Sequence, residues 1–400
     1  MMRIARTAVL AAVLGAFTMQ PGLALEPANL QFGPLYFTPT LDLQAYYTDN
    51  LWLTDTEEKN TWVGVITPRL QTWLQNGASD YSLTFELEDS TYASSDDDDY
   101  TDYTTTVDVH QVFNARNRLN LYGEYYDGHE KRGTGFIEGE LSLITDKPIE
   151  YERSTLGGDY TYGSKTSRGR LKVAAESVDF DYQNYRDFTR FFDRTEDALA
   201  GTLFWKVAPR TDALVEARAI NNDYDDEDPS DPAGTHTSDE LNYLLGVAWE
   251  ATGRTSGHVK LGMYDRDYDS GAREDEDGFL WEVGVRYQPR TYSTLDLNTR
   301  RYYQETNGLG DGINTRALNL GWGHSWNQRS STHLNLGYMN DDYEGGDRED
   351  DTYDLEARYE YGFRRWVDLS AGYRYQYRDS DLNFFDYSGN IFFLEARMGL

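Results

Sequence analysis

Hydrophobic and polar residues alternate one by one along most of the chain. The stretch 212–219 (DALVEARA) places alanine and valine on one face and aspartate, glutamate and arginine on the other. The stretches 279–288 (FLWEVGVRYQ) and 367–379 (VDLSAGYRYQYRD) repeat the pattern with aromatic residues on the apolar face. A period of two is typical of a β-strand whose two faces lie in different surroundings. The pattern therefore predicts an all-β fold.

Applied to the whole chain, the same pattern predicts eighteen strands of about 8 to 14 residues. Short turns, such as APRT at 208–211 and QPRT at 288–291, follow every second strand, and an arginine or lysine recurs in them. The strand centres are expected near residues 42, 67, 84, 107, 122, 156, 174, 201, 216, 244, 261, 282, 298, 319, 336, 356, 372 and 394. Longer, mostly acidic loops are expected at 48–60, 89–99, 127–148, 181–194, 221–238, 267–277, 304–313, 341–350 and 379–388.

This strict alternation of loop lengths favours one architecture. Outer-membrane barrels have short periplasmic turns at one rim and long extracellular loops at the other. In the repeated Pro-Arg-Thr segments, proline would preset the dihedral angle of the turn. A secreted soluble propeller or sandwich would also have regularly spaced strands, but it would not need this asymmetry. We therefore predict a transmembrane antiparallel up-and-down β-barrel over residues 35–400, with about 18 strands, or 16 or 20 if one hairpin is miscounted.

Tryptophans recur close to the predicted short turns. An aromatic belt at the membrane interface is typical of such barrels. We expect this belt to contain Trp73, Trp205, Trp249, Trp326 and Trp366.

The first 24 residues have the features of a cleaved secretory signal peptide. Arg3 and Arg6 precede an apolar stretch at 7–18, and Gly22-Leu23-Ala24 provides small residues for cleavage. Pro21 ends the apolar stretch too early for a membrane-spanning helix. Residues 25–34 would then form a short periplasmic segment. Export and a predicted barrel together indicate the outer membrane of a bacterial cell.

Composition excludes several classes of function. The net charge is −32, and removal of the two signal-peptide arginines makes it −34. Such a surface does not suit a nucleic-acid partner, because phosphate binding needs basic residues. The chain has no cysteine, which excludes disulfides, zinc–thiolate sites and thiol catalysis. A closed barrel suits a chain without disulfides, because every strand edge is paired.

The polar strand faces provide the candidate lumen lining. Their charges could form cross-strand ion pairs that brace the wall, or line a polar conduit, and the two roles are compatible. On the lipid face each charge would cost about 2–4 kcal/mol. The candidates are Glu86, Asp108, Tyr122, Glu124, Tyr126, Lys172, Glu216, Arg218, Glu282, Arg286, Asp296, Arg300, Glu356, Arg358, Arg374, Arg378, Glu395 and Arg397.

Two of these candidates, Tyr122 and Tyr126, are aromatic residues on a polar face. Aromatic rings stack on sugar rings, although packing near the rim would equally explain them. The acidic loops would repel an anionic polymer at low ionic strength. A neutral or cationic glycan is therefore favoured over an acidic one.

The longest connection is the segment 128–150. Its four glycines would let it fold into the lumen as a constriction, whereas LSLIT at 141–145 could pair as a short extracellular hairpin. We favour an extracellular loop.

The stretch 265–276 (DRDYDSGAREDE) has carboxylates at calcium-loop offsets. Its glycine stands at offset 7 instead of 6, so a solvated acidic loop is expected and no metal or cofactor is predicted. The relevant carboxylates are Asp265, Asp267, Asp269 and Glu276.

Catalytic motifs are absent from the sequence. Six histidines occur, but there is neither a Gly-x-Ser-x-Gly nor a His-Glu-x-x-His motif. Asp108 and His110 share a strand face without an identifiable third partner. Catalysis is therefore not expected.

The first predicted hairpin carries a resemblance to a known family. Asp49-Asn50-Leu51, an acidic loop and then Val65-Ile66-Thr67-Pro68-Arg69-Leu70 resemble the opening of the putative β-barrel porin 2 family. The Tyr- and Asp-rich repeats continue the likeness to the C-terminus. The last strand, 391–400 (IFFLEARMGL), is similar to the assembly signal of outer-membrane barrels, although it ends in Leu400 where phenylalanine is usual. Members of the family often accompany exopolysaccharide or capsule gene clusters, so the resemblance implies an outer-membrane barrel in polysaccharide export. It supplies no catalytic residue.

Three functions fit these observations. The favoured one is a passive channel that exports or translocates an exopolysaccharide or capsule glycan. A general diffusion porin for small solutes and a non-transport surface lectin or anchor are the alternatives. The expected partners are outer-membrane lipid, the glycan and, for an exporter, a periplasmic protein that delivers it. A monomer is expected, because no strand face carries an apolar patch reserved for a second subunit.

Overall fold

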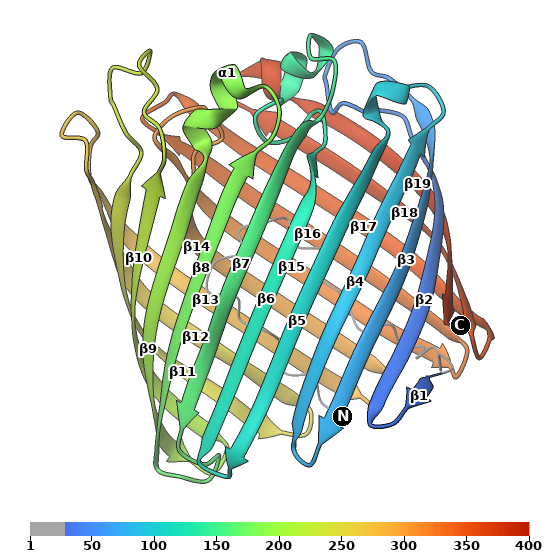
Figure 1. The fold of residues 1–400 in the computed structure, drawn as a ribbon, viewed down its shortest axis with the longest axis vertical. Coiled ribbons are helices and arrows are strands. Elements are labelled where there is room, and N and C mark those ends of the chain that lie inside the picture. The colour runs from blue at the N-terminus through green and yellow to red at the C-terminus, as the bar shows by residue number, and fades with distance from the viewer. Residues whose placement is uncertain (1–28, 400) are drawn as a thin grey trace.

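A computed structural model describes residues 29–399, and in it eighteen strands close into one antiparallel barrel (Figure 1). Each strand pairs with its neighbours in the chain, and β19 closes the ring on β2 from Ile391–Thr48 to Gly399–Thr40. The predicted architecture and strand number are confirmed. Each strand is centred within two residues of its expected position.

The strands of the wall are long, as a tilted barrel wall requires. They are β2 (Leu35–Thr48), β3 (Thr61–Asn76), β4 (Ser79–Tyr92), β5 (Tyr100–Asn114), β6 (Asn117–Glu130), β7 (Ile149–Tyr162), β8 (Gly169–Tyr182), β9 (Arg194–Ala208), β10 (Thr211–Tyr224), β11 (Ser238–Thr252), β12 (Thr255–Tyr268), β13 (Glu276–Arg290), β14 (Ser293–Glu305), β15 (Gly312–Asn327), β16 (Ser330–Glu344), β17 (Arg348–Arg364), β18 (Val367–Ser380) and β19 (Tyr387–Gly399). The loops at one end of the described barrel hold five short helices, which are η1 (Asp96–Asp98), η2 (Gly139–Leu143), α1 (Arg186–Thr189), η3 (Arg190–Phe192) and η4 (Asn383–Phe385).

A small strand, β1 (Leu30–Phe32), precedes the barrel and pairs with the first residues of β2. Gly33 has a φ of +61°, which a tight turn before Leu35 requires and which glycine adopts without strain. β19 pairs with β2 only as far as Thr40, and β1 pairs with residues 35–37 on the same edge of β2. β1 therefore covers part of the edge that β19 leaves open. The predicted signal peptide, residues 25–28 of the predicted periplasmic segment and Leu400 lie outside the described residues.

The predicted loops are shorter than expected, most of all the loop between β16 and β17. Residues 341–344 and 348–350 continue β16 and β17, with Asp342 opposite Glu349, and only 345–347 connect them. The backbone ladder continues here because its hydrogen bonds do not depend on an apolar face. The loop between β14 and β15 likewise shrinks to 306–311.

The two Pro-Arg-Thr segments also differ. Pro209 and Arg210 form the predicted turn, whereas Pro289 stays within β13 beside a register irregularity. Proline is tolerated there because an irregular position lacks a ladder hydrogen bond that it would have to donate.

The two faces of the wall differ as a membrane barrel requires. On β10, Val215 points outward and is exposed, whereas the neighbouring Glu216 points inward and is buried. Leucine, valine and aromatic residues recur on the outward face of every sector, and ion pairs recur on the inward face. No helix among residues 29–399 is long and apolar enough to cross a membrane.

The predicted aromatic belt is correct except for one residue. Trp205, Trp326 and Trp366 are exposed near the short turns, and Trp249 shares the outward face of β11 with exposed Leu245. Trp73 instead points inward, where its ring stacks on Tyr36 at a centroid distance of 4.3 Å. Closeness to a turn predicts the height of a residue in the membrane, but only the strand register shows which face it occupies.

The ladder between β13 and β14 stops early. Their ladder ends at the pair Trp281–Arg301, short of the loops. Beyond it, Glu305 of β14 crosses β13 and forms an ion pair of 2.5 Å with Arg266 on the inner face of β12. The Tyr303 hydroxyl of β14 likewise lies 2.9 Å from the hydroxyl of Tyr268, which is on β12. These side chains connect β14 to β12 across the end of β13.

Candidate functional site

The structure places all eighteen predicted lumen residues on the inward strand faces, opposite the exposed apolar residues. Many of them pair with one another. Arg218 and Lys260 both contact Glu216 and Glu282, at N–O distances of 2.7 to 3.3 Å. Three strands contribute to this four-residue network, and Thr202 also donates a hydrogen bond to Glu216 at 3.0 Å. Alternating charge in one patch is typical of a braced polar wall.

A second network lies where the barrel closes. Arg358 contacts Glu356 at 3.3 Å and Glu395 at 2.7 Å, and Arg397 joins Glu395 at 3.3 Å to Asp42 at 2.9 Å. It therefore connects β17, β19 and β2.

Other predicted residues form single pairs across neighbouring strands. The partners that the sequence did not single out are Arg69, Arg153, Asp159 and Asp354, and each lies on the inward face at a cross-strand position. Only the register could have identified them. The pairs are Glu86 with Arg69, Glu124 with Arg153 (2.7 Å), Lys172 with Asp159 (3.4 Å), Arg286 with Asp296 (2.7 Å) and Arg374 with Asp354 (2.5 Å). The remaining arginine, Arg300, stacks on Tyr302.

The inward aromatic residues are held in two ways. The Tyr126 hydroxyl donates to Asp102 at 2.7 Å, and the Arg153 guanidinium lies 5.6 Å from the centre of its ring. The Tyr122 hydroxyl donates to Glu176 on β8, and its ring crosses β7 at Gly157.

At the end with the long loops, residues 131–148, here called the lid, cross the mouth of the barrel. They leave from β6 and contact loops on both sides, including Trp52 of the β2–β3 loop, Asn307 of the β14–β15 loop and Phe384 of the β18–β19 loop. Figure 1 shows the loops and short helices gathered over this end.

The first anchor of the lid is Arg132, which is buried. Its guanidinium forms two charge-assisted hydrogen bonds with Asp98 and donates a third to the Thr145 carbonyl at 2.7 Å. The guanidinium also lies 4.5 Å from the centre of the Trp52 ring, and the Trp52 indole donates to Asp98 at 3.1 Å. Burial would raise the pKa of Asp98, but hydrogen bonds from Arg132, Ser95 and Trp52 outweigh it and lower that pKa.

The second anchor is Glu138, which reaches the opposite wall. It contacts Arg348 of β17 at 2.6 Å and Arg378 of β18 at 3.2 Å. Both arginines also face the fully buried Asp350, at 2.5 and 3.7 Å. Because two arginines share two carboxylates, removal of Glu138 would leave excess positive charge in a buried place.

The third anchor of the lid is apolar. Phe136 packs on Phe192 and Tyr182 at ring distances of 4.6 and 5.2 Å, and Ile137 packs on Ile149 in the same cluster.

The sequence had suggested two forms for this segment. LSLIT does not pair as a hairpin, because residues 139–143 form the 3-10 helix η2. The segment does lie at the end with the long loops, as the favoured alternative expected. No local pattern in the sequence indicates that the side chains of this segment reach β17 and β18.

A neighbouring cluster ties two further loops together. Arg273, whose side chain is 1% exposed, pairs with Asp231 at 2.5 Å and also with Asp311. His236 lies beside it, and burial together with Arg273 lowers the pKa of this histidine. Burial and Arg273 therefore disfavour the charged form of His236.

The remaining candidate sites do not assemble. Asp265 and Asp267 project outward from β12, and no group of three metal-ligating side chains occurs within residues 29–399. His110 contacts Asn120 at 2.5 Å, and Asp108 accepts a hydrogen bond from Ser82 at 3.3 Å.

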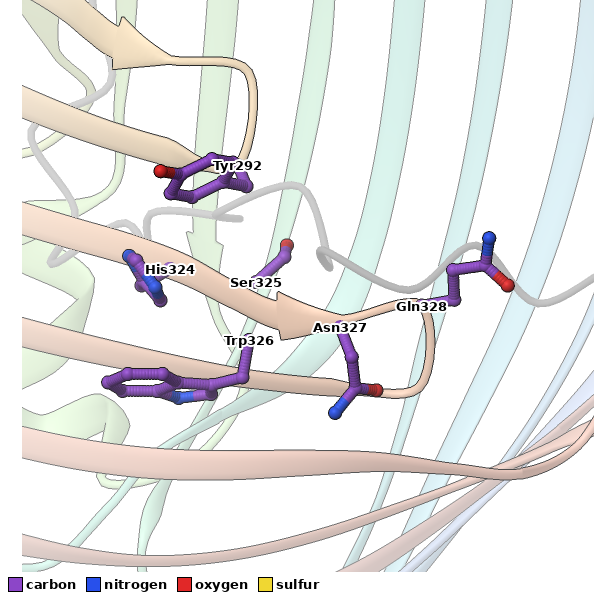
Figure 2. Close-up of a pocket in the computed structure, with 6 residues that line it drawn as sticks. All are labelled: Tyr292, His324, Ser325, Trp326, Asn327 and Gln328. Carbon is purple, nitrogen blue, oxygen red and sulfur yellow. The ribbon is translucent and has the colours of Figure 1, made fainter.

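A pocket of about 600 Å³ lies outside the lumen, at the rim with the short turns (Figure 2). Figure 2 shows the rings of Tyr292, His324 and Trp326 near one another at the strand ends. The His324 ring lies 4.3 Å from that of Trp326 and 5.4 Å from that of Tyr292. His324 and Trp326 share the outward face of β15 with exposed Leu320, so this pocket belongs to the aromatic belt.

Comparisons with solved structures find other membrane barrels. OpdO from Pseudomonas aeruginosa has a TM-score of 0.49 at 12% identity, covering 91% of this chain and 97% of that one. A BenF-like porin from Pseudomonas fluorescens Pf-5 has a TM-score of 0.46 at 8% identity, covering 91% and 99%. The siderophore receptor PiuA from Acinetobacter baumannii has a TM-score of 0.48 at 8% identity, covering 93% and 82%.

No curated protein matched the sequence. The family model described as putative beta-barrel porin 2 matches residues 24–399, which is nearly the whole chain. This agrees with the closed barrel, its outward apolar face and its alternation of short turns and long loops. The chain is a porin-like outer-membrane β-barrel and belongs to the putative beta-barrel porin 2 family.

Proposed function

We propose that the protein is a passive channel that carries a neutral glycan across the outer membrane and that the lid closes at rest. The lid carries this proposal, because a permanently open diffusion pore has no need for a loop held across its mouth by buried ion pairs. An eighteen-stranded wall encloses enough space for an aqueous path once such a loop moves.

The inward face supports a neutral solute more than an ionic one. Its charges are largely joined in cross-strand pairs, which leave hydrogen-bonding groups along the wall without one dominant sign. The acidic outer loops would in addition disfavour a polyanion. The channel would work as a monomer and without a cofactor, and an exporter would receive its glycan from a periplasmic partner.

The main alternative is a general diffusion porin for small solutes, which the wide barrel would suit equally well. A surface lectin or anchor is the third candidate, and it predicts a barrel that never conducts. These functions differ in the size of solute that passes and in whether the lid must open.

The test is the permeability of the refolded mature chain and of a variant in which residues 133–145 are replaced by a short Gly-Ser linker. Planar-bilayer conductance and liposome swelling would be measured with glucose, maltoheptaose, and polyethylene glycol of matching size. We expect a nearly silent wild type and a variant that conducts and admits maltoheptaose. Free passage of glucose through the wild type would favour the diffusion porin. A variant that folds but stays silent would contradict a channel.

A further inference from the structure

Trp73 requires an explanation that the membrane does not provide. The chain has nine tryptophans, and all of them lie within the described residues. Two lie in a loop or turn, Trp52 and Trp366, and the other six strand tryptophans occupy outward faces. Trp73 is on the inward face and half-buried, beside the periplasmic rim. The lipid interface therefore does not account for it.

The register places Trp73 in a row of inward side chains that runs across seven strands. Tyr36 is opposite Trp73, Trp73 is opposite Ser82, Ser82 is opposite Asp108, and Asp108 is opposite Tyr122. Gly157 of β7 is opposite Tyr122 of β6 on one side and opposite Glu176 of β8 on the other. We call these residues the inner row: Tyr36, Trp73, Ser82, Asp108, Tyr122 and Glu176.

The inner row rises through the barrel. Its first member lies one residue from the periplasmic start of β2, whereas its last lies seven residues into β8. This climb follows from the tilt of barrel strands, which makes a row perpendicular to the strands spiral around the axis. A solute that follows the row would therefore move from the periplasmic rim toward the opposite end of the barrel.

The three aromatic rings of the inner row are held in place by their neighbours. Trp73 and Tyr36 are stacked with 13° between their planes, and the Trp73 indole N–H is occupied by the Thr38 hydroxyl at 3.3 Å. The Tyr122 ring crosses Gly157, where a Cβ atom would lie only 2.4 Å from its Cζ. Glycine is thus required for this close approach.

Polar groups separate these rings at the spacing of the strands. Trp73 and Tyr122 stand three strands apart, or roughly 14 Å at the usual interstrand distance. Ser82 and Asp108 lie between them, and Glu176 follows. Apolar ring faces that alternate with a few well-placed hydroxyl and carboxylate groups suit a ligand with the same alternation. A chain of pyranose rings has C–H faces and hydroxyl edges in that order.

We propose that the inner row is a glycan-binding track, with Trp73 as the platform that receives a neutral sugar chain at the periplasmic entrance. The two carboxylates of the row, Asp108 and Glu176, would disfavour an anionic chain. This inference rests on the proposed function and names where the glycan would bind. Because the lid closes the opposite end, the track is open to binding even when the channel is shut.

The test is isothermal titration of the refolded full-length mature chain in detergent with maltoheptaose and with cellohexaose. Trp73→Ala should weaken binding about tenfold, which is the loss expected for one aromatic contact. Gly157→Ala should also weaken it, because the added methyl group displaces the Tyr122 ring without removing any aromatic residue. Trp205→Ala, on the lipid face, is the matched control and should bind as the wild type does. Heat-modifiable gel mobility would verify that each variant is folded.

Several results would overturn the track. They are unchanged affinity in both Trp73→Ala and Gly157→Ala, equal loss in Trp205→Ala, and no binding of either oligosaccharide to the wild type. The channel is judged separately by permeability. If binding depends on Trp73 but the lid-replaced variant does not conduct, the track is supported and the channel is contradicted. If sugar permeates and Trp73→Ala changes neither permeation nor binding, the channel is supported and the track is contradicted.

Discussion

Arg266 near the extracellular mouth has a side chain that is 1% exposed, whereas Arg286 near the periplasmic rim is 54% exposed. Both belong to inward strand faces, and both pair with a carboxylate at 2.5 to 2.7 Å. The first is covered by side chains of β14, and the second borders open lumen. The same type of ion pair is therefore placed in two very different surroundings.

This difference indicates a division of labour along the barrel axis. A buried ion pair is costly to break, because the remaining charge stays out of water, whereas an exposed pair contributes little. The mouth thus has discrete contacts that hold one arrangement, and the periplasmic half has a wall that tolerates change. From this difference we infer a barrel that is closed at the mouth and open to a ligand at the periplasmic end.

The largest effect is expected from Glu138→Ala. It leaves Arg348 and Arg378 to share Asp350 alone, and loss of one partner of a buried ion pair costs about 3–5 kcal/mol. If only the closed lid bears this cost, the open fraction should rise at least about 100-fold. Single-channel recordings would show it as a large increase in open time.

Glu140→Ala is the matched control on the same loop, since Glu140 only accepts an exposed hydrogen bond from the Thr56 hydroxyl at 3.1 Å. It should leave the open time unchanged. Equal open times for wild type and Glu138→Ala would show that the Glu138 anchor does not hold the lid.

A second substitution tests the buried charges of the wall at the mouth. Arg266→Ala leaves Glu305 and Glu240 without their shared cation, at former distances of 2.5 and 3.5 Å. We expect the free energy of unfolding to fall by about 3 kcal/mol or more. Urea unfolding in detergent, followed by tryptophan fluorescence, would measure it. A loss below about 1 kcal/mol would mean that water reaches this cluster.

The sequence predicted the strands well because a membrane wall imposes one pattern on every residue. Val215 and Glu216 can be assigned to opposite faces from their alternation alone. Trp73 was misassigned because its distance from a turn does not specify its face. The lid contacts of Glu138 could not be predicted, because Arg348 lies 210 residues away and no local pattern joins them. Register and loop paths are long-range properties, and so are the sites that depend on them.

The acid response of the lid should be smaller than the effect of removing Glu138. Hydrogen bonds from Arg132 place the pKa of Asp98 below its ordinary value near 3.9. The stabilisation from a carboxylate with a lowered pKa is complete above the ordinary pKa and is lost as the pH falls through the lowered one. The lid should therefore remain shut between pH 7 and pH 5 and loosen only below about pH 4.

Conductance recorded over this pH range would test the prediction, with Asp98→Asn as the reference. The variant should open more often at pH 7, because a charged partner of Arg132 is lost, and should respond less to acid. Opening of the wild type between pH 7 and pH 5 would contradict the role given to Asp98.

The smallest effect is expected at the periplasmic end, from Arg286→Ala. Its pair with Asp296 borders water, and exposed pairs contribute about 0–1 kcal/mol, so unfolding and lid opening should both stay close to wild type. The same urea titration and conductance recordings measure this variant beside Arg266→Ala and Glu138→Ala. A loss as large as that of Arg266→Ala would mean that the two ends are equally dry. The open entrance on which a periplasmic glycan track depends would then lose its physical basis.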